Sequence, residues 1–331
     1  MEKIPSKSWD SAAYDKQNQE WVYARLHSYD HQQESIVQPV KTREIKKDRR
    51  KPFKKPYKEL LVFGDSQIGY RNIGGELVPI HDERAINAIT KLAEDRRPHE
   101  LIELGDTTDF AELSRFAPDS NHFQGTLQPS MQRTHEFFAD LTEVTPGSER
   151  HTVDSNHVKR LGDYVLKHAM PLADLKNGKY PAISYPGLLQ LDQIGWEFHG
   201  GYGAAEYAYA DDLAFKHGNI ATKAGTARKL SESREAEGRN IVQGHAHRIE
   251  TQYRTDRSGK QLGAFVVGAL CRTDGFVPSY YNSVDQYGDP VGHYEDWQNG
   301  FMVVKDYGEG RYQFDQVPIH DGKILYEGKS Y

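Results

Sequence analysis

The chain has 331 residues, of which 37% are hydrophobic and 27% are charged, with 20 Tyr and 13 Phe. This composition supplies enough apolar surface for one large α/β domain or two smaller ones, and it excludes a chain that is disordered throughout. The net charge of -6 hides an asymmetry, because residues 1–58 carry 14 Lys and Arg against 8 Asp and Glu, whereas the remainder carries 28 against 40.

Two features bear on the compartment. The single cysteine, Cys271, cannot form an internal disulfide, which fits a reducing compartment and predicts a small apolar core residue. The first ten residues lack the apolar run of a secretory signal, and the chain has no run of 18 apolar residues that would span a bilayer. We therefore expect a cytoplasmic protein with no membrane partner.

The N-terminal part reads as a helix followed by a basic arm. Residues from Asp15 to about Tyr29 place Trp21, Val22 and Leu26 on a thin apolar stripe, which predicts a helix. Residues 41–58 contain ten basic residues, two acidic ones and two prolines, a composition that favours solvation over packing. This arm is a candidate contact for nucleic acid, since cations that neutralise phosphates release counterions, and a merely solvated charge run is the alternative. The predicted boundary divides residues 1–58 from a folded body over 59–331.

The folded body begins with a β-α-β pattern. Residues 59–63 form a short apolar run that ends at Gly64, as expected of a buried strand. Residues 81–97 have helical spacing with Asp82 as N-cap, and residues 101–104 predict a second strand, parallel to the first. Three more strands are predicted at residues 151–154, 212–215 and 239–242.

Beyond His247 the pattern changes to antiparallel hairpins. One pairs residues 249–254 with 261–267, and the other pairs residues 301–305 with 311–318. We expect residues 249–331 to supply the hairpins of a second sheet. Residues 273–299, rich in Tyr, Gly, Asp and Pro, predict a long surface loop.

Short polar clusters recur along the body, most of them where a predicted strand ends. In chain order they are Asp65-Ser66-Gln67, Gly105-Asp106-Thr107-Thr108-Asp109, Ser155-Asn156-His157, His217-Gly218 and Gly244-His245-Ala246-His247. In open α/β sheets the carboxyl ends of the strands line one crevice, so these side chains are expected to converge there. Convergence of Asp, Asn and His is what a metal site requires.

This ordered set resembles the calcineurin-like metallophosphoesterase family, including members encoded by phages and bacteria, whose pattern is D-x-H, G-D-x-x-D, G-N-H-[E/D], H and G-H-x-H. The resemblance covers roughly residues 60–247. It implies an α/β fold of two mixed β-sheets packed as a sandwich and flanked by helices. It also implies two metal ions, one held by Asp65, Gln67, Asp106 and His247, and the other by Asp106, Asn156, His217 and His245. His157 matches the catalytic histidine of the family, and Asp109 matches an acid that orients it in some members.

These ligand types also suggest the metals and the chemistry. Carboxylate, amide and imidazole ligands without thiolate suit Mn²⁺, Fe or Zn²⁺, of which Mn²⁺ is our first choice. Two such ions activate a bridging water and hold the phosphoryl oxygens, while His157 supplies a proton to the leaving oxygen. Gln67 departs from the family's usual His and predicts weaker binding of the first ion. Ser155 and Val158 replace the usual Gly and acidic residue of the third motif.

The predicted function is hydrolysis of a phosphodiester in nucleic acid or a nucleotide. A phosphomonoesterase with the same site is one alternative, and a non-catalytic metal-binding or assembly protein is another. A further alternative starts from residues 63–66, which also resemble the nucleophile block of GDSL-type esterases and would make Ser66 the nucleophile. That reading leaves Asp106, His245 and His247 without a role.

Several residues retain two interpretations. His199 competes with His217 as a metal ligand, because both precede a glycine. Asn156 is a plausible helix cap and His157 a plausible surface helix residue. Arg160 and Arg248 flank two of the motifs, where they would either grip a phosphate or remain solvated.

Overall fold

The chain divides into two compact units, Met1–Gln38 and Pro39–Tyr331. The computed structural model describes residues 7–15, 20–28, 40–45, 52, 54–114, 120–274 and 294–331. In the first unit, β1 (Lys7–Asp15) and β2 (Glu20–Ser28) pair as antiparallel strands. The helix predicted from Asp15 to Tyr29 is therefore wrong. The residues of β2 include a Trp-Val-Tyr run with high strand propensity, and a partner strand favours that preference over the helical spacing.

The larger of the two main sheets in the second unit contains β3 (Lys58–Phe63), β6 (Glu100–Glu103), β7 (Glu149–Val153), β10 (Glu197–His199), β16 (Gly300–Asp306), β17 (Tyr312–His320), β18 (Lys323–Tyr326) and β19 (Lys329–Ser330). Their spatial order is β10-β7-β6-β3-β16-β17-β18-β19. The first four strands run parallel, and β16 pairs antiparallel with both β3 and β17. The sheet is therefore mixed.

The second main sheet contains β11 (Tyr207–Ala210), β12 (Leu213–Lys216), β13 (Asn240–Gln243), β14 (Glu250–Thr255) and β15 (Gln261–Val266). Its order is β11-β12-β13-β15-β14, with β12, β13 and β15 parallel and antiparallel strands at both edges. Two small hairpins add β4 (Tyr70–Ile73) with β5 (Glu76–Pro79), and β8 (Lys176–Asn177) with β9 (Tyr180–Pro181).

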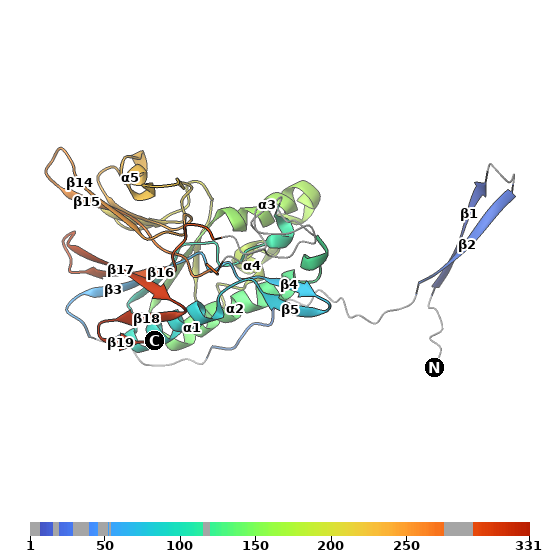
Figure 1. The fold of residues 1–331 in the computed structure, drawn as a ribbon, viewed down its shortest axis with the longest axis horizontal. Helices are drawn as coiled ribbons and strands as arrows, with labels where there is room; N and C mark the ends of the chain where they lie inside the picture. The colour runs from blue at the N-terminus through green and yellow to red at the C-terminus, as the bar shows by residue number, and fades with distance from the viewer. Residues whose placement is uncertain are drawn as a thin grey trace. The chain divides into compact units, whose positions relative to one another are not determined.

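The two sheets face each other, with helices on their outer sides. The α-helices are α1 (Glu83–Arg96), α2 (Leu127–Val144), α3 (Asn156–His168), α4 (Tyr185–Leu188) and α5 (Thr226–Ser231). Short 3-10 helices span Ala111–Leu113, Ser120–Phe123, Met170–Leu172 and Arg234–Ala236. In Figure 1, α5 lies beside β14 and β15, and α1 and α2 lie on the far side of the larger sheet. The predicted α/β sandwich of two mixed sheets is confirmed.

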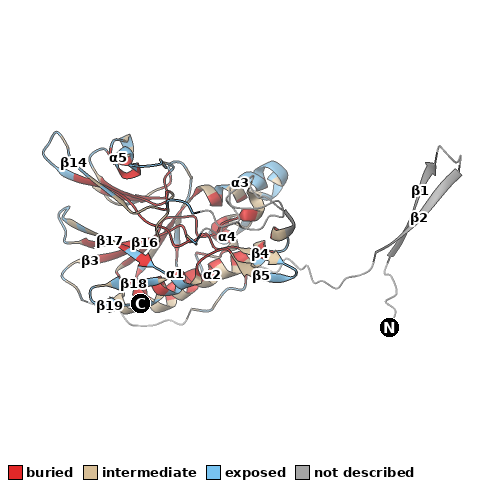
Figure 2. Ribbon diagram, viewed as in Figure 1, coloured by how far each residue is buried: buried red, intermediate tan, exposed pale blue. Residues whose placement is uncertain are grey.

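Buried residues, red in Figure 2, run along the strands of both main sheets. Between the sheets lie side chains such as Val62, Phe215 and Phe265, and between the larger sheet and its helices lie Phe63 and Phe137. Successive residues of β3 point to opposite sides of the larger sheet, and both sides are buried. Most of the residues of this strand are therefore apolar. Full burial of each such side chain contributes roughly 1.5–3 kcal/mol.

The predicted strands of the body are all present, and α1 begins after Asp82, whose carboxylate accepts a hydrogen bond from Arg84 N at 2.9 Å. The two C-terminal hairpins are also present, but they do not share the second sheet. Strands β14 and β15 join that sheet, whereas β16 and β17 extend the larger one, with Met302 opposite Val62. Alternation within a hairpin does not specify which sheet it joins, so this part of the prediction is wrong.

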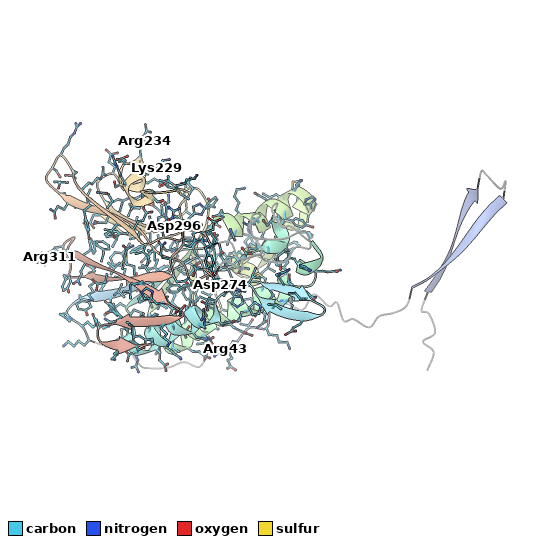
Figure 3. The ribbon with its side chains drawn as sticks, viewed as in Figure 1. Arg43, Lys229, Arg234, Asp274, Asp296 and Arg311 are labelled. Carbon is cyan, nitrogen blue, oxygen red and sulfur yellow. The ribbon has the colours of Figure 1, made fainter. Side chains whose placement is uncertain are left out.

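Both ends of the predicted basic arm contact the body. Val40, the residue before the arm, is buried, and Arg43 bonds to Asp140 and Glu143 of α2. Figure 3 places Arg43 on the side of the molecule opposite Lys229 of α5. At the other end, Lys55 pairs with the buried Glu59 at 2.7 Å. Residues 46–51 and 53 of the arm lie outside the described residues.

Candidate metal centre

The first two polar clusters are joined by backbone hydrogen bonds where β3 and β6 end. Asp65 N donates to Gly105 O and Gln67 N donates to Asp106 O, both at 2.9 Å. Gly64 packs against Leu104 so closely that a Cβ atom would lie 2.9 Å from the Leu104 Cβ. The two loops therefore run side by side and present their acidic residues together.

The backbone of the loops that carry the predicted ligands has an unusual conformation. Among the described residues, the non-glycine residues with positive φ include Asp65 (54°), Gln67 (47°), Asp106 (53°), His245 (66°) and His247 (53°). Such left-handed conformations cost about 1–3 kcal/mol each and persist where the surroundings enforce them, which is common at functional sites. Five of the seven residues predicted as metal ligands carry this strain.

One group of predicted ligands is formed by Asp65, Gln67 and His247. His247 Nε2 lies 3.1 Å from Asp65 Oδ1 and 3.4 Å from the Gln67 amide. Asp65 Oδ2 accepts a hydrogen bond of 3.0 Å from the backbone of His245, which ties this group to the next. All three side chains are buried, so their polar atoms face one another and not solvent.

The second group is formed by Asp106, Asn156, His217 and His245. His217 Nε2 lies 2.7 Å from Asn156 Oδ1 and 3.3 Å from Asp106 Oδ2, while its Nδ1 bonds to Leu104 O at 2.9 Å. Ligand atoms of Asp106, His217 and His245 all lie within 4.8 Å of one another. The bond to Leu104 leaves Nε2 of His217 facing the carboxylate, in a position suited to a metal ligand.

The electrostatics of this group reflect closely packed charges. Burial opposes protonation of His217, but the Asp106 carboxylate outweighs it and raises the pKa of His217 to about 9. Burial also disfavours a charged Asp106, yet His157 and His217 hold the pKa of Asp106 well below its usual range. Burial, with the nearby His217, lowers the pKa of His245 to about 4. The group therefore contains a carboxylate that requires a positive partner and a neutral imidazole with a free lone pair.

His157 lies between Asp109, Asp106 and Arg160. Arg160 donates to His157 Nε2 at 2.9 Å and to the Asp109 carbonyl at 2.8 Å. Because that bond makes Nε2 an acceptor, the ring proton lies on Nδ1, which is 3.0 Å from Asp109 Oδ1 but is not aligned for a hydrogen bond. His157 is buried on α3 and is not a surface helix residue.

Glu103 and Ser155 support the Asp106 turn, and the sequence analysis did not predict this role for either residue. Glu103 is fully buried, accepts from Gly105 N at 3.0 Å and from Thr152, and its pKa is raised to about 7 by burial. Ser155, the N-cap of α3, accepts from Asp106 N at 3.0 Å. A Cβ on Gly105 would lie 2.7 Å from the Ser155 Cβ, so this turn needs glycine. The available signal for Glu103 was an acidic residue within the otherwise apolar run of residues 101–104.

Two hollows adjoin the ligands. The Trp297 ring packs edge-on against His247, with centroids 4.3 Å apart, and lines a cavity of about 960 Å³. Figure 3 shows Asp274, which lines the same cavity, near the middle of the molecule. On the other side, Asn156 and Arg160 line a hollow of about 570 Å³. Cys271 is buried as predicted, with its sulfur 3.9 Å from His247 Nδ1.

Three residues that the sequence offered for other roles, His199, Ser66 and Arg248, lack the contacts that those roles need. His199 pairs with His151 and not with Asp106, so His217 is the histidine beside the predicted bridging carboxylate. The hydroxyl of Ser66 is buried and has no hydrogen-bond partner among the described residues, which leaves it without a base. Arg248 bonds to backbone carbonyls of Thr222 and Asp296.

The donor set fits two divalent ions of hard or borderline character. It combines two buried carboxylates, two amide side chains and three imidazoles, with no thiolate among the groups described above. Asp65 and Asp106 are 0% and 1% exposed, and buried carboxylates are stable when paired or bound to a metal. The structure therefore brings the predicted ligands close together, and their division into two ligand sets stays a prediction.

Comparison with known proteins gives distant relatives. No family model matches the chain. The chain is 24% identical over 279 residues to the Gene 54 protein of Mycobacterium phage D29, and 24% identical over 280 residues to the Gene 54 protein of Mycobacterium phage L5. Each alignment covers 82% of this chain, and 97% and 98% of the two relatives. Neither name states an activity.

Among solved structures, the chain is similar to Pseudomonas putida nuclease MPE, with 14% identity and a TM-score of 0.32 over 74% of this chain and 84% of that one.

Within the described residues, no helix is both long enough and apolar enough to cross a membrane.

Proposed function

We propose that this protein is a dinuclear-metal phosphoesterase of the calcineurin-like type that hydrolyses phosphodiesters. The observation that carries the proposal is the position of Asp106. Its carboxylate lies 3.3 Å from His217 and 3.6 Å from His157, and its loop is bonded to the Asp65-Gln67 loop. One set of ligands is Asp65, Gln67, Asp106 and His247, and the other is Asp106, Asn156, His217 and His245, with Mn²⁺ as first choice and Fe or Zn²⁺ as alternatives.

The ions would supply an activated water and a clamp for the phosphoryl oxygens. Other residues hold the proposed ligands in place. Glu103 and Ser155 fix the Asp106 turn, and Leu104 O fixes the His217 ring. His157 is proposed to donate a proton from Nε2 to the leaving oxygen, with Asp109 stabilising the charged ring through Nδ1. For this step Arg160 must release Nε2, which a contact of Arg160 with a substrate phosphate would favour, and Nε2 must then take up a proton from solvent water, the proton that it passes to the leaving oxygen.

The hollow beside Asn156 supports a polynucleotide or nucleotide substrate. It is lined by the cations Arg160 and Lys167, by the carboxylates Glu112 and Asp163, and by Tyr164, an aromatic residue that is 51% exposed. Cations that follow a phosphate chain and an exposed ring on which a base stacks are typical of single-stranded nucleic acid sites. The basic arm, residues 41–58, is proposed to add further phosphate contacts.

A phosphomonoesterase with the same metal ligands is the second candidate, and turnover on paired substrates separates the two. After EDTA treatment and restoration of Mn²⁺, we expect turnover of bis-p-nitrophenyl phosphate to exceed that of p-nitrophenyl phosphate. His245→Ala should abolish both, whereas Glu76→Gln, a change at an exposed residue of β5, should leave them unchanged. A folded protein without turnover on either compound under any divalent metal would favour a non-catalytic binding protein.

A further inference from the structure

A second cluster of imidazoles and carboxylates lies outside the proposed catalytic site, at the edge of the larger sheet. His151 Nδ1 lies 3.1 Å from His199 Nε2 and 3.7 Å from Glu197 Oε2. The parallel pairing of β7 and β10 sets Glu197 opposite His151, and residues two apart on a strand share a face. The strand register thus places all three side chains on one face.

The other nitrogen of His151 has an unexplained environment. His151 is 7% exposed, and its ring stacks on Tyr207 with centroids 3.9 Å apart. Among the described residues the buried Nε2 atom has no hydrogen-bond partner, although Glu100 Oε2 and Glu149 Oε2 each lie 4.0 Å away. Tyr207 donates to the same Glu100 oxygen at 2.9 Å, which fixes that carboxylate in place. Two carboxylates near Nε2 favour a proton on that nitrogen, which leaves the Nδ1 lone pair on the side of His199 and Glu197.

We propose that His151 Nδ1, His199 Nε2 and Glu197 Oε2 bind a divalent transition-metal ion of the Zn²⁺ class. A tetrahedral ion with ligands at about 2.0–2.1 Å places ligand atoms about 3.3 Å apart, close to the observed 3.1 and 3.7 Å. Coordination through Nδ1 puts the ring proton on Nε2, where Glu100 and Glu149 attract it. A metal-bound histidine usually donates its other ring N–H to a carboxylate, and Glu100 and Glu149 are carboxylates near Nε2, each at 4.0 Å and short of a hydrogen bond.

The state of the two histidines supports this arrangement. Burial lowers the pKa of His151 and of His199, which favours the neutral imidazoles that metals bind. The ion would join β10, a strand of three residues at the sheet edge, to its neighbour β7. This site is therefore expected to stabilise the sheet edge, independently of turnover at the catalytic centre.

Zinc binding tests the proposal in a background that lacks the catalytic ligands, Asp106→Asn with His245→Asn. Equilibrium dialysis should show one Zn²⁺ retained per chain, and Zn²⁺ should raise the Tm of this protein. Glu197→Gln and His199→Asn are the test variants, because both side chains are partly exposed and their replacement should leave folding intact. Each should weaken Zn²⁺ binding at least tenfold, whereas Glu76→Gln and His320→Asn should leave it unchanged.

Two results would overturn the proposal. One is a folded background protein, with an unaltered far-UV circular dichroism spectrum, that retains no Zn²⁺. The other is binding that survives His199→Asn but is lost on Glu149→Gln, which would place the ion on the opposite ring nitrogen of His151.

Discussion

Replacing Gly244 by alanine should damage the metal centre with a single added methyl group. Gly244 precedes His245, and its φ is not positive, so its backbone accepts alanine. The new Cβ would lie 2.6 Å from Asp65 Oδ2, the atom that accepts the His245 N–H at 3.0 Å. The Asp65 carboxylate must therefore move by close to 1 Å, which disturbs its contacts with His245 and His247.

The expected cost has two parts. Overpacking a buried position typically costs about 1–3 kcal/mol of folding free energy, which urea unfolding measures. A displacement of about 1 Å at a reacting centre costs about 10²-fold in rate, so kcat/KM on bis-p-nitrophenyl phosphate should fall by about that factor and the Mn²⁺ requirement should rise.

Gly162→Ala is the matched control for this substitution. Gly162 lies on α3, and no atom of the part of the chain that the structure describes lies within 4 Å of the Cβ that alanine would add. Alanine in an exposed helix position should raise the free energy of unfolding by about 0.5–1 kcal/mol and leave turnover unchanged. Unaltered turnover and Mn²⁺ affinity in Gly244→Ala would refute the placement of Asp65 as a ligand.

Three further predictions concern an ion pair, the proposed acid and the arm. A hydrogen bond from Arg133 lowers the pKa of Glu83 below its ordinary 4.5, so this pair stabilises the fold above pH 4.5 and its contribution is lost as pH falls below that value. Arg133→Met should cost about 1 kcal/mol at pH 7, since Glu83 is partly exposed, with a smaller difference at pH 3 by urea unfolding; an equal difference at both pH values would contradict this. His157→Asn should lower kcat about 10²- to 10⁴-fold with Mn²⁺ affinity retained, and an unchanged kcat would remove it as the acid. Glutamine at five basic arm positions should flatten the salt dependence of nucleic-acid binding, and an unchanged slope would exclude contact by Lys46, Lys47, Arg49, Arg50 and Lys51.

The sequence predicted the local elements around the site well, because strand ends and caps depend on neighbouring residues. The run before Gly64 and the N-cap at Asp82 are both specified locally. The α2 helix was not predicted; its Pro129 lies in the first turn, where a missing N–H breaks no helical bond. A proline there is compatible with a helix start and need not mark a break.

The sequence did not predict the pairing of distant strands or the contacts that support the site. The pairing of β16 with β3 joins residues more than 200 positions apart, and alternation along β16 does not identify its partner. The same holds for Trp297 against His247 and for Ser155 against Asp106. Local patterns favoured His217 over His199, and the structure adds the contact itself, because His217 follows β12 of the second sheet and lies 3.3 Å from Asp106, which follows β6 of the larger sheet.

The central claim is that Asp106 bridges two metal ions, and electron paramagnetic resonance of the Mn²⁺-loaded protein tests it most directly. We predict the spectrum of an exchange-coupled Mn²⁺ pair in the wild-type protein. In folded Asp106→Asn we predict the spectrum of isolated ions, together with loss of turnover on bis-p-nitrophenyl phosphate. A wild-type spectrum of isolated Mn²⁺ only, or a coupled pair with full turnover in Asp106→Asn, would contradict the account.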